Sequence, residues 1–455
     1  MNKIIPIFYS EYGRYINRFR AIPSFIDGLK PVERRVLISL YKEGRKKAVK
    51  SATVVGYALG HLHPHGDQSL YGTLVNMVHQ EYAKGEGNWG SPGLEDADPA
   101  AYRYTETSLE KWVDDLAFTY LDEKYVPYQE FELEPEPLYL PSPIPIGLIG
   151  NGVITGISFY RTLIPKYKLS DLAKRLFWIL SGKNTKTEII ICPVCKDCTI
   201  QEVENGEFKN ILVNGIGSLN YIPNGKIDQK NIHILGRAPN SSFNSLIEDQ
   251  EKLDIVLIEN SGETIDVLIE PKKRSMQLQE IGKNIWQNYL IKKLNFNCLF
   301  CDNEGIVTTY GIDQILEYNY NLWKYSVQLK NIDEYNKLSA KKIEFMIVQI
   351  IRYIIETHKP NSTNELVEKF KELKKNSDIN LEIDIFNIET LTWKKEIKNI
   401  IENDIITVCG KRTIKNLVET IIDIKKIDSE LVAAKSLIDN CDVNCFNYID
   451  ELSKI

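Results

Sequence analysis

The sequence has little of what marks secreted and membrane proteins. It holds 8 cysteines in 455 residues, too few for a disulfide scaffold. The apolar run at the N-terminus ends at Glu11, which makes it too short for a signal peptide. The longest uncharged stretch, residues 138–160, is broken by three prolines and four glycines, so it predicts loop and strands in place of a membrane span. We therefore expect an intracellular protein with no membrane partner.

Signals for nucleotide binding are missing as well. The sequence contains no GxxxxGK[ST] loop, and Asp96 and Asp98 suit a loop better than a metal-binding DxD pair. The composition, 43% hydrophobic and 26% charged, is that of an ordinary globular protein. A chain of this length favours about two to four domains.

Charge is distributed very unevenly, although the net charge is only -6. Residues 14–50 hold eleven Lys and Arg against three acids, whereas residues 81–136 hold four against fifteen. The basic segment is a candidate site for a polyanion, and a solvated charged face is the alternative.

Three short helices are expected near the N-terminus. Apolar residues at four-residue spacing predict a helix over 31–41, and a second over 51–60 follows a basic turn. After the turn HPHG, Asp67 is placed to cap a third helix. Arg34 and Arg35 fall off the apolar stripe of the first helix. A helix, a turn and a helix with a basic flank are typical of proteins that read the major groove of DNA.

Two further regions follow. Residues 166–310 alternate strand-like runs (EIIIC, NILVN, IVLIE, IDVLIE) with turns, which predicts a mixed α/β domain. Heptad spacing over 322–353, with Leu322 at an a position and Tyr325 at d, and over 414–438, with Asp428 and Lys435 as interruptions, predicts an antiparallel coiled coil. Two core helices of a bundle are the alternative.

Four motifs lie close together in the first 110 residues. They are RAIPSFIDGLKPVERRVL from Arg20, SATVVGYALGHLHPHGD from Ser51, EGNWGS from Glu86 and AAYRYTE from Ala100. In this order they resemble the breakage-reunion subunit of type IIA DNA topoisomerases, the group of gyrase A, the topoisomerase IV A subunit and, most of all, the short medium subunit of T-even-type phage topoisomerases.

The resemblance implies an α+β multidomain fold. Its expected parts are a winged-helix (helix-turn-helix) DNA-gate domain over 1–140, an α/β tower domain over 141–310 and a long antiparallel coiled coil over 311–455. A terminal dimer-gate head is expected within the last part, at about 360–409.

The resemblance makes Tyr104 of AAYRYTE the nucleophile and Arg103 the arginine beside it. A phenol titrates near ~10 and is a poor nucleophile at neutral pH unless its oxyanion is stabilised. Arg103 stays charged, so it can stabilise that oxyanion and bind the phosphate. The product would be a phosphotyrosyl ester on the 5′ end of the cut strand, and resealing it would need no ATP.

Basic residues of the other motifs match family positions that line the cleaved strand. Arg20 is expected to assist catalysis, while Lys30, Arg34 and Arg35 would neutralise phosphates and fix the register of the DNA. An ordinary exposed basic helix is the alternative for each of them.

The resemblance also assigns the turn HPHGD and the string GNGVITG. One of His63 and His65 is expected to contact a phosphate close to Tyr104. Val153 matches a β-branched residue that wedges between base pairs and bends the DNA, and Ile154 is its competitor.

The chain departs from the family at three positions. Glu33 stands where a His or a neighbouring residue is usual, before the paired arginines. Gln68 and Gly72 replace the small hydroxyl and the acidic residue that anchor quinolone drugs in bacterial members. We therefore expect quinolones to stabilise cleavage poorly.

Cysteine pairs raise a zinc alternative. Cys192, Cys195 and Cys198 form CPVCKDC, and Cys298 and Cys301 form CLFC. About a hundred intervening residues is far outside the compact spacing of zinc knuckles, so buried thiols are favoured and no metal is assigned to this chain.

The expected function is a transient double-strand break in DNA, with strand passage and resealing. The resemblance implies a homodimer, joined at the DNA gate and at the C-gate, that works with an ATPase/TOPRIM subunit; that partner would hold Mg²⁺ and hydrolyse ATP. Because only about fifteen residues follow the second heptad helix, we expect relaxation or decatenation without supercoiling. A non-catalytic winged-helix DNA-binding or architectural protein is the alternative, and a zinc-dependent nuclease is a remote third.

Overall fold

The computed structural model describes residues 4–131, 133–182, 187–228, 231–262, 264–272, 277–358, 365, 368–369 and 424–455. The chain falls into two compact units, residues 1–330 with 441–455, and residues 331–440. Almost all of the predicted head at 360–409 lies outside the described residues, and the predicted boundary near 140 stays a prediction. None of the described helices is both long and apolar enough to cross a membrane.

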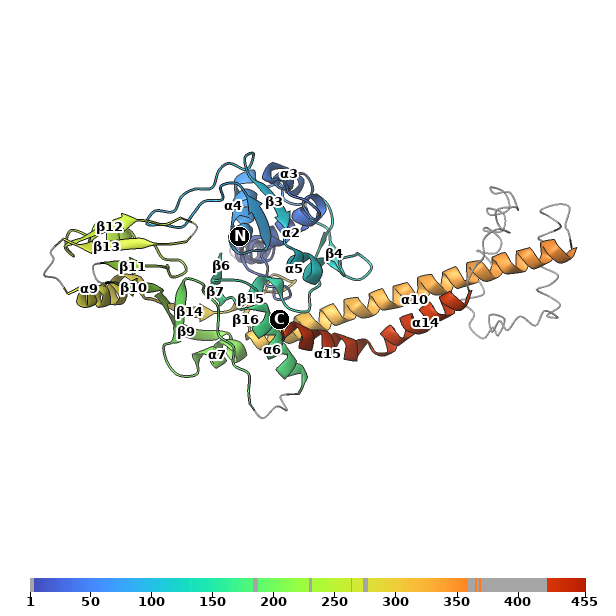
Figure 1. Cartoon of the computed structure of the whole chain (residues 1–455). Coiled ribbons are helices and arrows are strands. Elements are labelled where there is room, and N and C mark those ends of the chain that lie inside the picture. The colour runs from blue at the N-terminus through green and yellow to red at the C-terminus, as the bar shows by residue number, and fades with distance from the viewer. Residues whose placement is uncertain are drawn as a thin grey trace. The chain divides into compact units, whose positions relative to one another are not determined.

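The first unit begins with short helices (Figure 1). They are α1 (Ile4–Ile16), η1 (Asn17–Ala21), α2 (Pro31–Glu43), α3 (Ser51–His61) and α4 (Asp67–His79). The three predicted helices are thus confirmed as α2, α3 and α4. Their apolar side chains share one core, which includes Val36, Leu40, Val54, Ala58, Leu70, Leu74 and Met77.

A small antiparallel sheet completes this part of the chain, with strand order β1-β3-β2. Its strands are β1 (Val49–Lys50), β2 (Ala83–Glu86) and β3 (Glu106–Leu109). Val49 lies opposite Thr107, and Lys84 lies opposite Ser108. We call α2, α3, α4 and this sheet the N-terminal module; the loop between β2 and β3 carries Tyr104.

Short elements lead from the module to the next sheets. They are α5 (Lys111–Val113), η2 (Asp114–Phe118), β4 (Tyr128–Gln129), β5 (Glu136–Pro137) and η3 (Ile146–Leu148). The uncharged stretch over 138–160 forms loop, η3 and a strand, as the sequence predicts.

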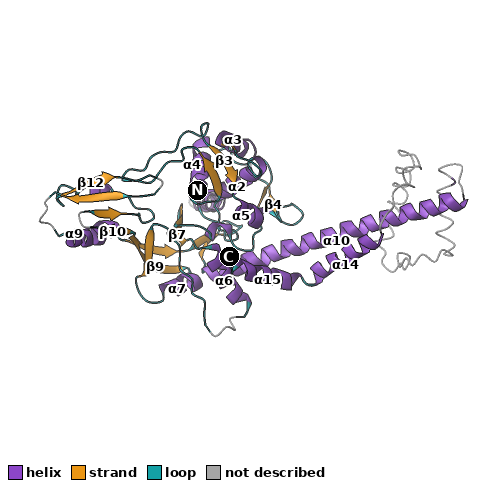
Figure 2. Ribbon diagram, in the orientation of Figure 1, coloured by secondary structure: helices purple, strands orange, loops and turns teal. Residues whose placement is uncertain are grey.

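A five-stranded antiparallel sheet of order β6-β7-β14-β9-β8 follows. Figure 2 labels β7 and β9 of this sheet among the strands drawn in orange. Its strands and adjoining elements are β6 (Val153–Ile157), β7 (Arg161–Pro165), α6 (Leu169–Leu180), β8 (Cys198–Glu202), α7 (Glu207–Asn214), β9 (Ile216–Pro223), β14 (Lys292–Asn297), β15 (Leu299–Cys301) and β16 (Val307–Thr309). Residues 188–192 (EIIIC) form no strand and residues 210–214 (NILVN) lie in α7, so these two strand predictions are wrong.

A four-stranded sheet of order β10-β11-β13-β12 has its own apolar core. Its elements are β10 (Gly225–Ile227), β11 (Ile232–Ile234), α8 (Asn244–Glu248), β12 (Ile255–Glu259), β13 (Val267–Pro271), α9 (Leu278–Ile285) and η4 (Trp286–Leu290). Here IVLIE forms β12 and IDVLIE largely overlaps β13, which confirms both strand predictions. The mixed α/β character predicted for this region is also confirmed.

The last helices are α10 (Ile312–His358), α14 (Ile424–Asp439) and α15 (Cys441–Leu452). In the second unit, α10 and α14 run antiparallel: Asn331 donates to the Leu437 carbonyl at 3.3 Å, and Lys342 pairs with Asp428 at 2.6 Å. Asp428, predicted as an interruption of the apolar seam, therefore makes an ion pair with the facing helix.

The predicted heptad register of α10 is wrong in the described residues. Tyr325 and Ile332, both at d positions, are 56% and 43% exposed. The buried positions are Trp323, Ser326 and Val327. Trp323 stacks on Tyr448 of α15 with ring centroids 5.6 Å apart, so packing within the first unit sets the buried face here.

Gly147 should tolerate no side chain. A Cβ at this position would lie 2.1 Å from the carbonyl oxygen of Gly28, a backbone atom that cannot move aside. We expect Gly147→Ala to lower the free energy of unfolding by about 1–3 kcal/mol. Gly56→Ala is the matched control: nothing lies within 4 Å of its Cβ in α3, and it should stabilise by about 0.5–1 kcal/mol. Denaturant unfolding measures both, and equal stability of the two variants would contradict this packing.

Candidate active site

Tyr104 stands on a tight turn with its side chain 65% exposed. Its backbone N–H donates to the Ala101 carbonyl at 2.8 Å, which closes the turn. A large aromatic side chain usually gains by burial, so an exposed tyrosine on an ordered turn is available for contact with another molecule.

The first turn of α3 holds the backbone on both sides of this tyrosine. The N–H of Ser51 donates to the Thr105 carbonyl at 3.0 Å, and the N–H of Ala52 donates to the Tyr102 carbonyl at 3.2 Å. The N–H groups at a helix start lack partners within the helix, so they can anchor a loop. The Ser51 and Thr105 hydroxyls also meet at 2.8 Å, and Thr105 is fully buried. Sequence reasoning missed Ser51 and Thr105 as anchors, although both lie inside the motifs.

Helix α4 anchors the same loop from a second side. The Tyr71 hydroxyl donates to the Ala100 carbonyl at 2.6 Å, and the Tyr102 hydroxyl donates to the Asp67 carboxylate at 3.1 Å. The predicted cap role of Asp67 is wrong: Gly66, with φ of 101°, precedes the helix, and no side chain caps it. Asp67 instead raises the pKa of Tyr102 through its hydrogen bond.

Arg103 and Tyr104 lie together as predicted. The Arg103 Cζ lies 4.7 Å from the centroid of the Tyr104 ring. A hydrogen bond with the Tyr104 phenol raises the pKa of Arg103, so its charge is secure. A guanidinium beside a phenol oxygen offers further donors to a phosphate.

Arg34 is buried. This corrects the sequence prediction, which placed Arg34 outside the apolar face of its helix. Its Nε and Nη2 donate to the Asp27 carboxylate at 2.7 and 2.9 Å. Burial alone would lower the pKa of Arg34, but the Asp27 carboxylate outweighs burial and raises it. Its charge is thus neutralised inside the protein, so the structure does not place Arg34 at a phosphate.

Arg35 is buried too, with 1% exposure. It donates to the Glu136 carboxylate at 2.7 and 2.9 Å, and its Nη1 lies 2.8 Å from the Nδ1 of His63. A guanidinium only donates, so Nδ1 of His63 must accept and the proton of the neutral ring sits on Nε2. The predicted surface role of Arg35 is therefore corrected to a positioning role: it orients His63.

His63 is nearly buried, whereas His65 is exposed. Their rings meet edge to face with centroids 5.0 Å apart. Of the two predicted contacts, His65 is the one whose side chain faces outward, and the phosphate contact stays a prediction.

Arg20 and Lys30 line one cavity of about 600 Å³, together with Tyr12, Ile157 and Phe159. No acidic side chain stands among its described lining residues, so the two cations are available to an anion. Tyr104 and Arg103 do not line this cavity. The predicted site residues therefore form two groups in this chain. Arg20 and Lys30 make one, and Tyr104 with Arg103 makes the other.

The structure also places the two wedge candidates, Val153 and Ile154, and the unusual Glu33. Val153 begins β6 opposite Pro165 and is half-buried, whereas Ile154 is 5% exposed and belongs to the core. Val153 is therefore the better placed of the two wedge candidates. Glu33 accepts the Lys30 N–H at 2.8 Å and so completes the first turn of α2.

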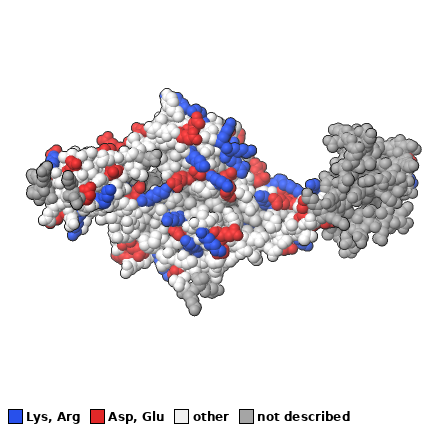
Figure 3. Space-filling view, in the orientation of Figure 1, with Lys and Arg blue, Asp and Glu red and all other residues white. Residues whose placement is uncertain are grey.

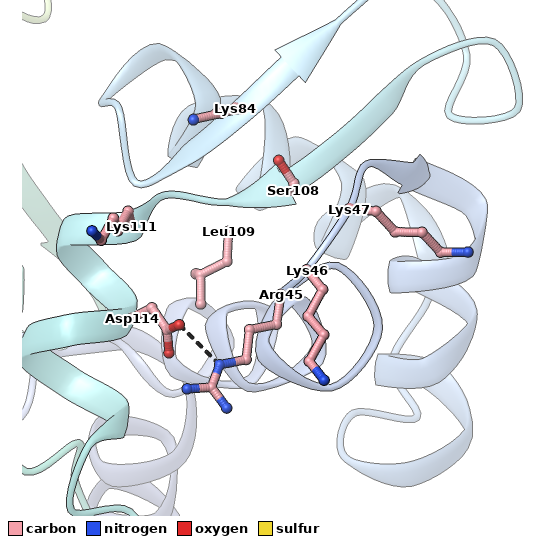
Figure 4. Close-up of a pocket in the computed structure, with 8 residues that line it drawn as sticks. All are labelled: Arg45, Lys46, Lys47, Lys84, Ser108, Leu109, Lys111 and Asp114. Atoms are coloured by element: carbon pink, nitrogen blue, oxygen red, sulfur yellow. Dashed lines mark hydrogen bonds and ion pairs between the residues drawn. The ribbon is translucent and has the colours of Figure 1, made fainter.

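A basic hollow of about 280 Å³ lies at the far end of the small sheet (Figure 4). The basic residues around it are Arg45, Lys46, Lys47, Lys84 and Lys111. Arg45 pairs with Asp114 at 2.8 Å, which raises the pKa of Arg45. Among the described residues, Lys46, Lys47 and Lys111 have no ion pair within 4.0 Å. Figure 3 shows Lys and Arg gathered over α2 and α3.

The basic segment over 14–50 thus divides into two kinds of residue. Arg34 and Arg35 are neutralised inside the protein, whereas residues 45–47 present their charge to solvent. The sequence pattern could not make this distinction, because it counts charges without their partners.

Lys166 is a buried cation without a carboxylate partner within 4.0 Å in the described residues. Its Nζ lies 3.0 Å from the Tyr82 hydroxyl and also donates to Gln80. Burial lowers the pKa of Lys166 to about 8. Its backbone N–H donates to the Gly152 carbonyl at 3.1 Å, so it lies next to the loop that leads into Val153.

Metal-binding groups do not gather in the described part of the chain. No three His, Cys, Asp or Glu side chains come together there as a resident metal would require.

Comparison with known proteins now identifies the class. The family of the A subunits of DNA gyrase and topoisomerase IV matches residues 20–439, and the chain belongs to this family. Its relatives include the gyrase A protein of Mycolicibacterium smegmatis, 36% identical over 194 residues, which are 40% of this chain and 22% of that protein. The further likeness to phage medium subunits stays a prediction.

Other relatives show similar identity over a similar share of the chain. The gyrase A protein of Haemophilus influenzae is 40% identical over 176 residues, 36% of this chain and 19% of that protein. The topoisomerase 4 A protein of Streptococcus pneumoniae is 36% identical over 192 residues, 40% of this chain and 23% of that protein. The chain thus matches less than a quarter of the length of each relative.

Lys166 should make stability depend on pH in a predictable direction. Its pKa is about 8 in the folded chain and 10.5 ordinarily, so between these values the unfolded chain binds the proton more strongly. The free energy of unfolding therefore rises with pH across this window, and the full penalty of the buried charge is present below pH 8. Lys166→Met lacks this gain, so its stability relative to the unmodified chain should fall by about 3 kcal/mol across the window. Urea unfolding measures both free energies of unfolding as a function of pH. If the two proteins changed in parallel, this role of Lys166 would be ruled out.

Proposed function

We propose that the chain is the DNA-cleaving and religating subunit of an ATP-dependent type II DNA topoisomerase. Family membership supports the reaction class. The single observation that carries the proposal is the exposed Tyr104 phenol, which stands on a turn anchored to α3 and α4 with the Arg103 guanidinium over its ring.

The chemistry follows from these two side chains. The Tyr104 oxygen loses its proton and attacks a backbone phosphorus of DNA; the bond from phosphorus to the 3′ oxygen breaks, and that oxygen takes up a proton. The 5′ phosphate stays on Tyr104 as an ester, and the reverse attack by the 3′ hydroxyl reseals the strand. Arg103 would stabilise the negative charge that develops on the phenol and the phosphate.

A chain with one such tyrosine cuts one strand, so a double-strand break needs two copies. We propose a homodimer, with contacts at the DNA gate and at the head. In this assignment the N-terminal module is the winged-helix DNA-gate part. The sheets that follow it form the tower, and α10 with α14 forms the coiled coil.

DNA would be held by cations outside the tyrosine turn. Arg20 and Lys30 in their cavity, and the lysines of the basic hollow, are suited to neutralise phosphates. His65 is the exposed member of the histidine pair, and Val153 is the half-buried residue suited to wedge between base pairs. Arg34 and Arg35 would act indirectly, by fixing the shape of the module.

Mg²⁺ and ATP are proposed to reside on a partner subunit of the ATPase/TOPRIM type. The described residues offer no cluster that fits a resident metal, so no step above uses a metal held by this chain. The complex would act on double-stranded DNA inside a bacterial or phage-infected cell. The alternative function, a non-catalytic DNA-binding protein of the same fold, predicts the same basic surfaces and no covalent product.

Tyr104→Phe should abolish covalent attachment to DNA. The hydroxyl is the attacking atom, whereas affinity comes from the cations, so binding should change less than about twofold. The chain with its ATPase partner, Mg²⁺ and end-labelled DNA is stopped with denaturant, and the protein-bound label is counted. Tyr325→Phe is the matched control, since it makes the same chemical change at an exposed tyrosine of α10, outside the loop that carries Tyr104, and should retain the adduct. An adduct that persists in Tyr104→Phe would sink the proposal, and one absent from the unmodified chain would favour the non-catalytic alternative.

Reversing charges at the basic hollow should weaken DNA binding through the phosphates. We expect Lys46→Glu combined with Lys47→Glu to reduce the slope of log affinity against log salt by about 1–2, one for each phosphate that is no longer neutralised. Lys226→Glu is the control, because this exposed lysine of β10 lies in a different sheet. Filter binding or fluorescence anisotropy over a salt series measures the slopes, and equal slopes for all three proteins would remove the hollow from the DNA-binding surface.

A further inference from the structure

The segment CPVCKDC lies against the loop that leads into Val153. The Gly152 N–H donates to the Val194 carbonyl at 2.9 Å, and the Lys196 N–H donates to the Asn151 side chain at 2.7 Å. From the other side, the Val194 N–H donates to the Lys166 carbonyl at 2.8 Å. Residues 194 and 196, which flank Cys195, are therefore hydrogen-bonded directly to the loop and to the end of β7.

Cys195 and Cys198 stand at the two ends of a tight turn. The Cys198 N–H donates to the Cys195 carbonyl at 3.3 Å, which closes a four-residue turn. The ends of such a turn lie less than about 7 Å apart, within the span that a disulfide bridges. Cys195 is partly exposed, whereas Cys198 is buried at the start of β8. The pair thus has one thiol that a reagent can reach and one behind it.

The surroundings of the two sulfurs shift the pKa values of the two thiols in opposite directions. A hydrogen bond from Cys198 lowers the pKa of Cys195, and the backbone N–H groups of Asp197 and Cys198 act in the same direction against the effect of burial. The same thiol contact, together with burial, raises the pKa of Cys198. Cys195 is therefore the better nucleophile, and Cys198 is suited to attack second.

We propose that Cys195 and Cys198 form a reversible dithiol-disulfide site for small-molecule disulfides of the glutathione class, and that its redox state acts on the loop over Asn151 and Gly152. This proposal does not rest on the proposed function.

The exchange balances in two steps. The Cys195 thiolate attacks one sulfur of oxidised glutathione, which forms a mixed disulfide and releases one glutathione thiolate. Cys198 then attacks the Cys195 sulfur, which closes the bond between the two cysteines and releases the second glutathione. The proton of Cys198 passes to that leaving thiolate. Counted from the dithiol, the Cys195 proton ends on the first glutathione thiolate and the Cys198 proton on the second, so the protein loses two electrons and two protons and glutathione disulfide gains them.

Closing the bond has a mechanical consequence. The sulfurs must approach to about 2.05 Å, well inside a hydrogen-bond contact, so the turn has to tighten. Val194 and Lys196 are attached to the loop by single hydrogen bonds, and movement of the turn strains both. The first effect should be weaker protection of the Gly152 N–H.

Other cysteines of the described chain are less suited to this reaction. Cys298 is fully buried, and burial raises its pKa; burial also raises the pKa of Cys301 to about 12. Cys441 and Cys445 lie four residues apart on α15, and burial raises the pKa of Cys445 to about 12. Cys192 is exposed, but burial of its sulfur raises its pKa.

The test treats the full chain with oxidised glutathione, blocks free thiols and maps disulfides by mass spectrometry. We expect a bond between Cys195 and Cys198 that dithiothreitol reverses, formed at least about tenfold faster than any reaction of Cys298. Cys198→Ser should trap glutathione on Cys195, and Cys192→Ser should leave the bond unchanged. A bond from Cys195 to Cys192, or reaction no faster than at Cys298, would overturn the assignment.

Amide hydrogen exchange tests the coupling to the loop. Oxidation should speed exchange of the Gly152 N–H by at least about fivefold in the unmodified chain and leave it unchanged in Cys195→Ser. Unchanged exchange in a chain with the mapped disulfide would overturn the coupling. Because neither measurement uses DNA, failure here is distinguishable from failure of the proposed function.

Discussion

The buried carboxylate of Asp27 fixes the N-terminal module to the chain that follows it. It accepts two hydrogen bonds from Arg34, one from the Leu29 N–H and one from the Leu140 N–H. Its own carbonyl accepts from the Gly147 N–H at 2.8 Å. A charge fully removed from water must be paired and hydrogen-bonded, so the helix and two distant loop segments can meet in only one arrangement.

The neighbouring Arg35 extends this fixed arrangement toward the surface. Arg35 joins Glu136 to His63, so the turn HPHGD is tied to a buried ion pair. The start of α3 then holds the loop around Tyr104 through Ser51 and Thr105. The result is a fixed backbone beneath an exposed phenol, which suits the proposed role of Tyr104 as a nucleophile that meets a phosphate.

The helices of the N-terminal module could be predicted from the sequence, because a local pattern of apolar residues indicates each of them. Apolar spacing located α2 and α3 to within two residues. The AAYRYTE string proposed Tyr104 and Arg103, and their roles stay predictions. Buried charge could not be read in this way. Arg34 and Arg35 find their carboxylates 7 and 101 residues away, and no local periodicity reports such partners.

The misassigned elements have physical causes as well. The run NILVN has strand-like residues but lies between Gly206 and Gly215, whose φ values of 94° and 73° suit the ends of a short helix. The predicted heptads run over 322–353, yet at Trp323 the helix packs on Tyr448 of α15. Contacts made by tertiary packing decided the buried face there, against the heptad pattern.

The most direct test of the central claim is to identify the atom that joins protein and DNA. The chain is incubated on end-labelled duplex with the proposed ATPase partner, trapped with denaturant and digested with protease and nuclease, and the nucleotide-bearing peptide is sequenced by mass spectrometry. The account predicts a single modified peptide that spans AAYRYTE, with the 5′ phosphate on Tyr104 and a free 3′ hydroxyl on the DNA. Attachment at another residue, or through a 3′ phosphate, would contradict it.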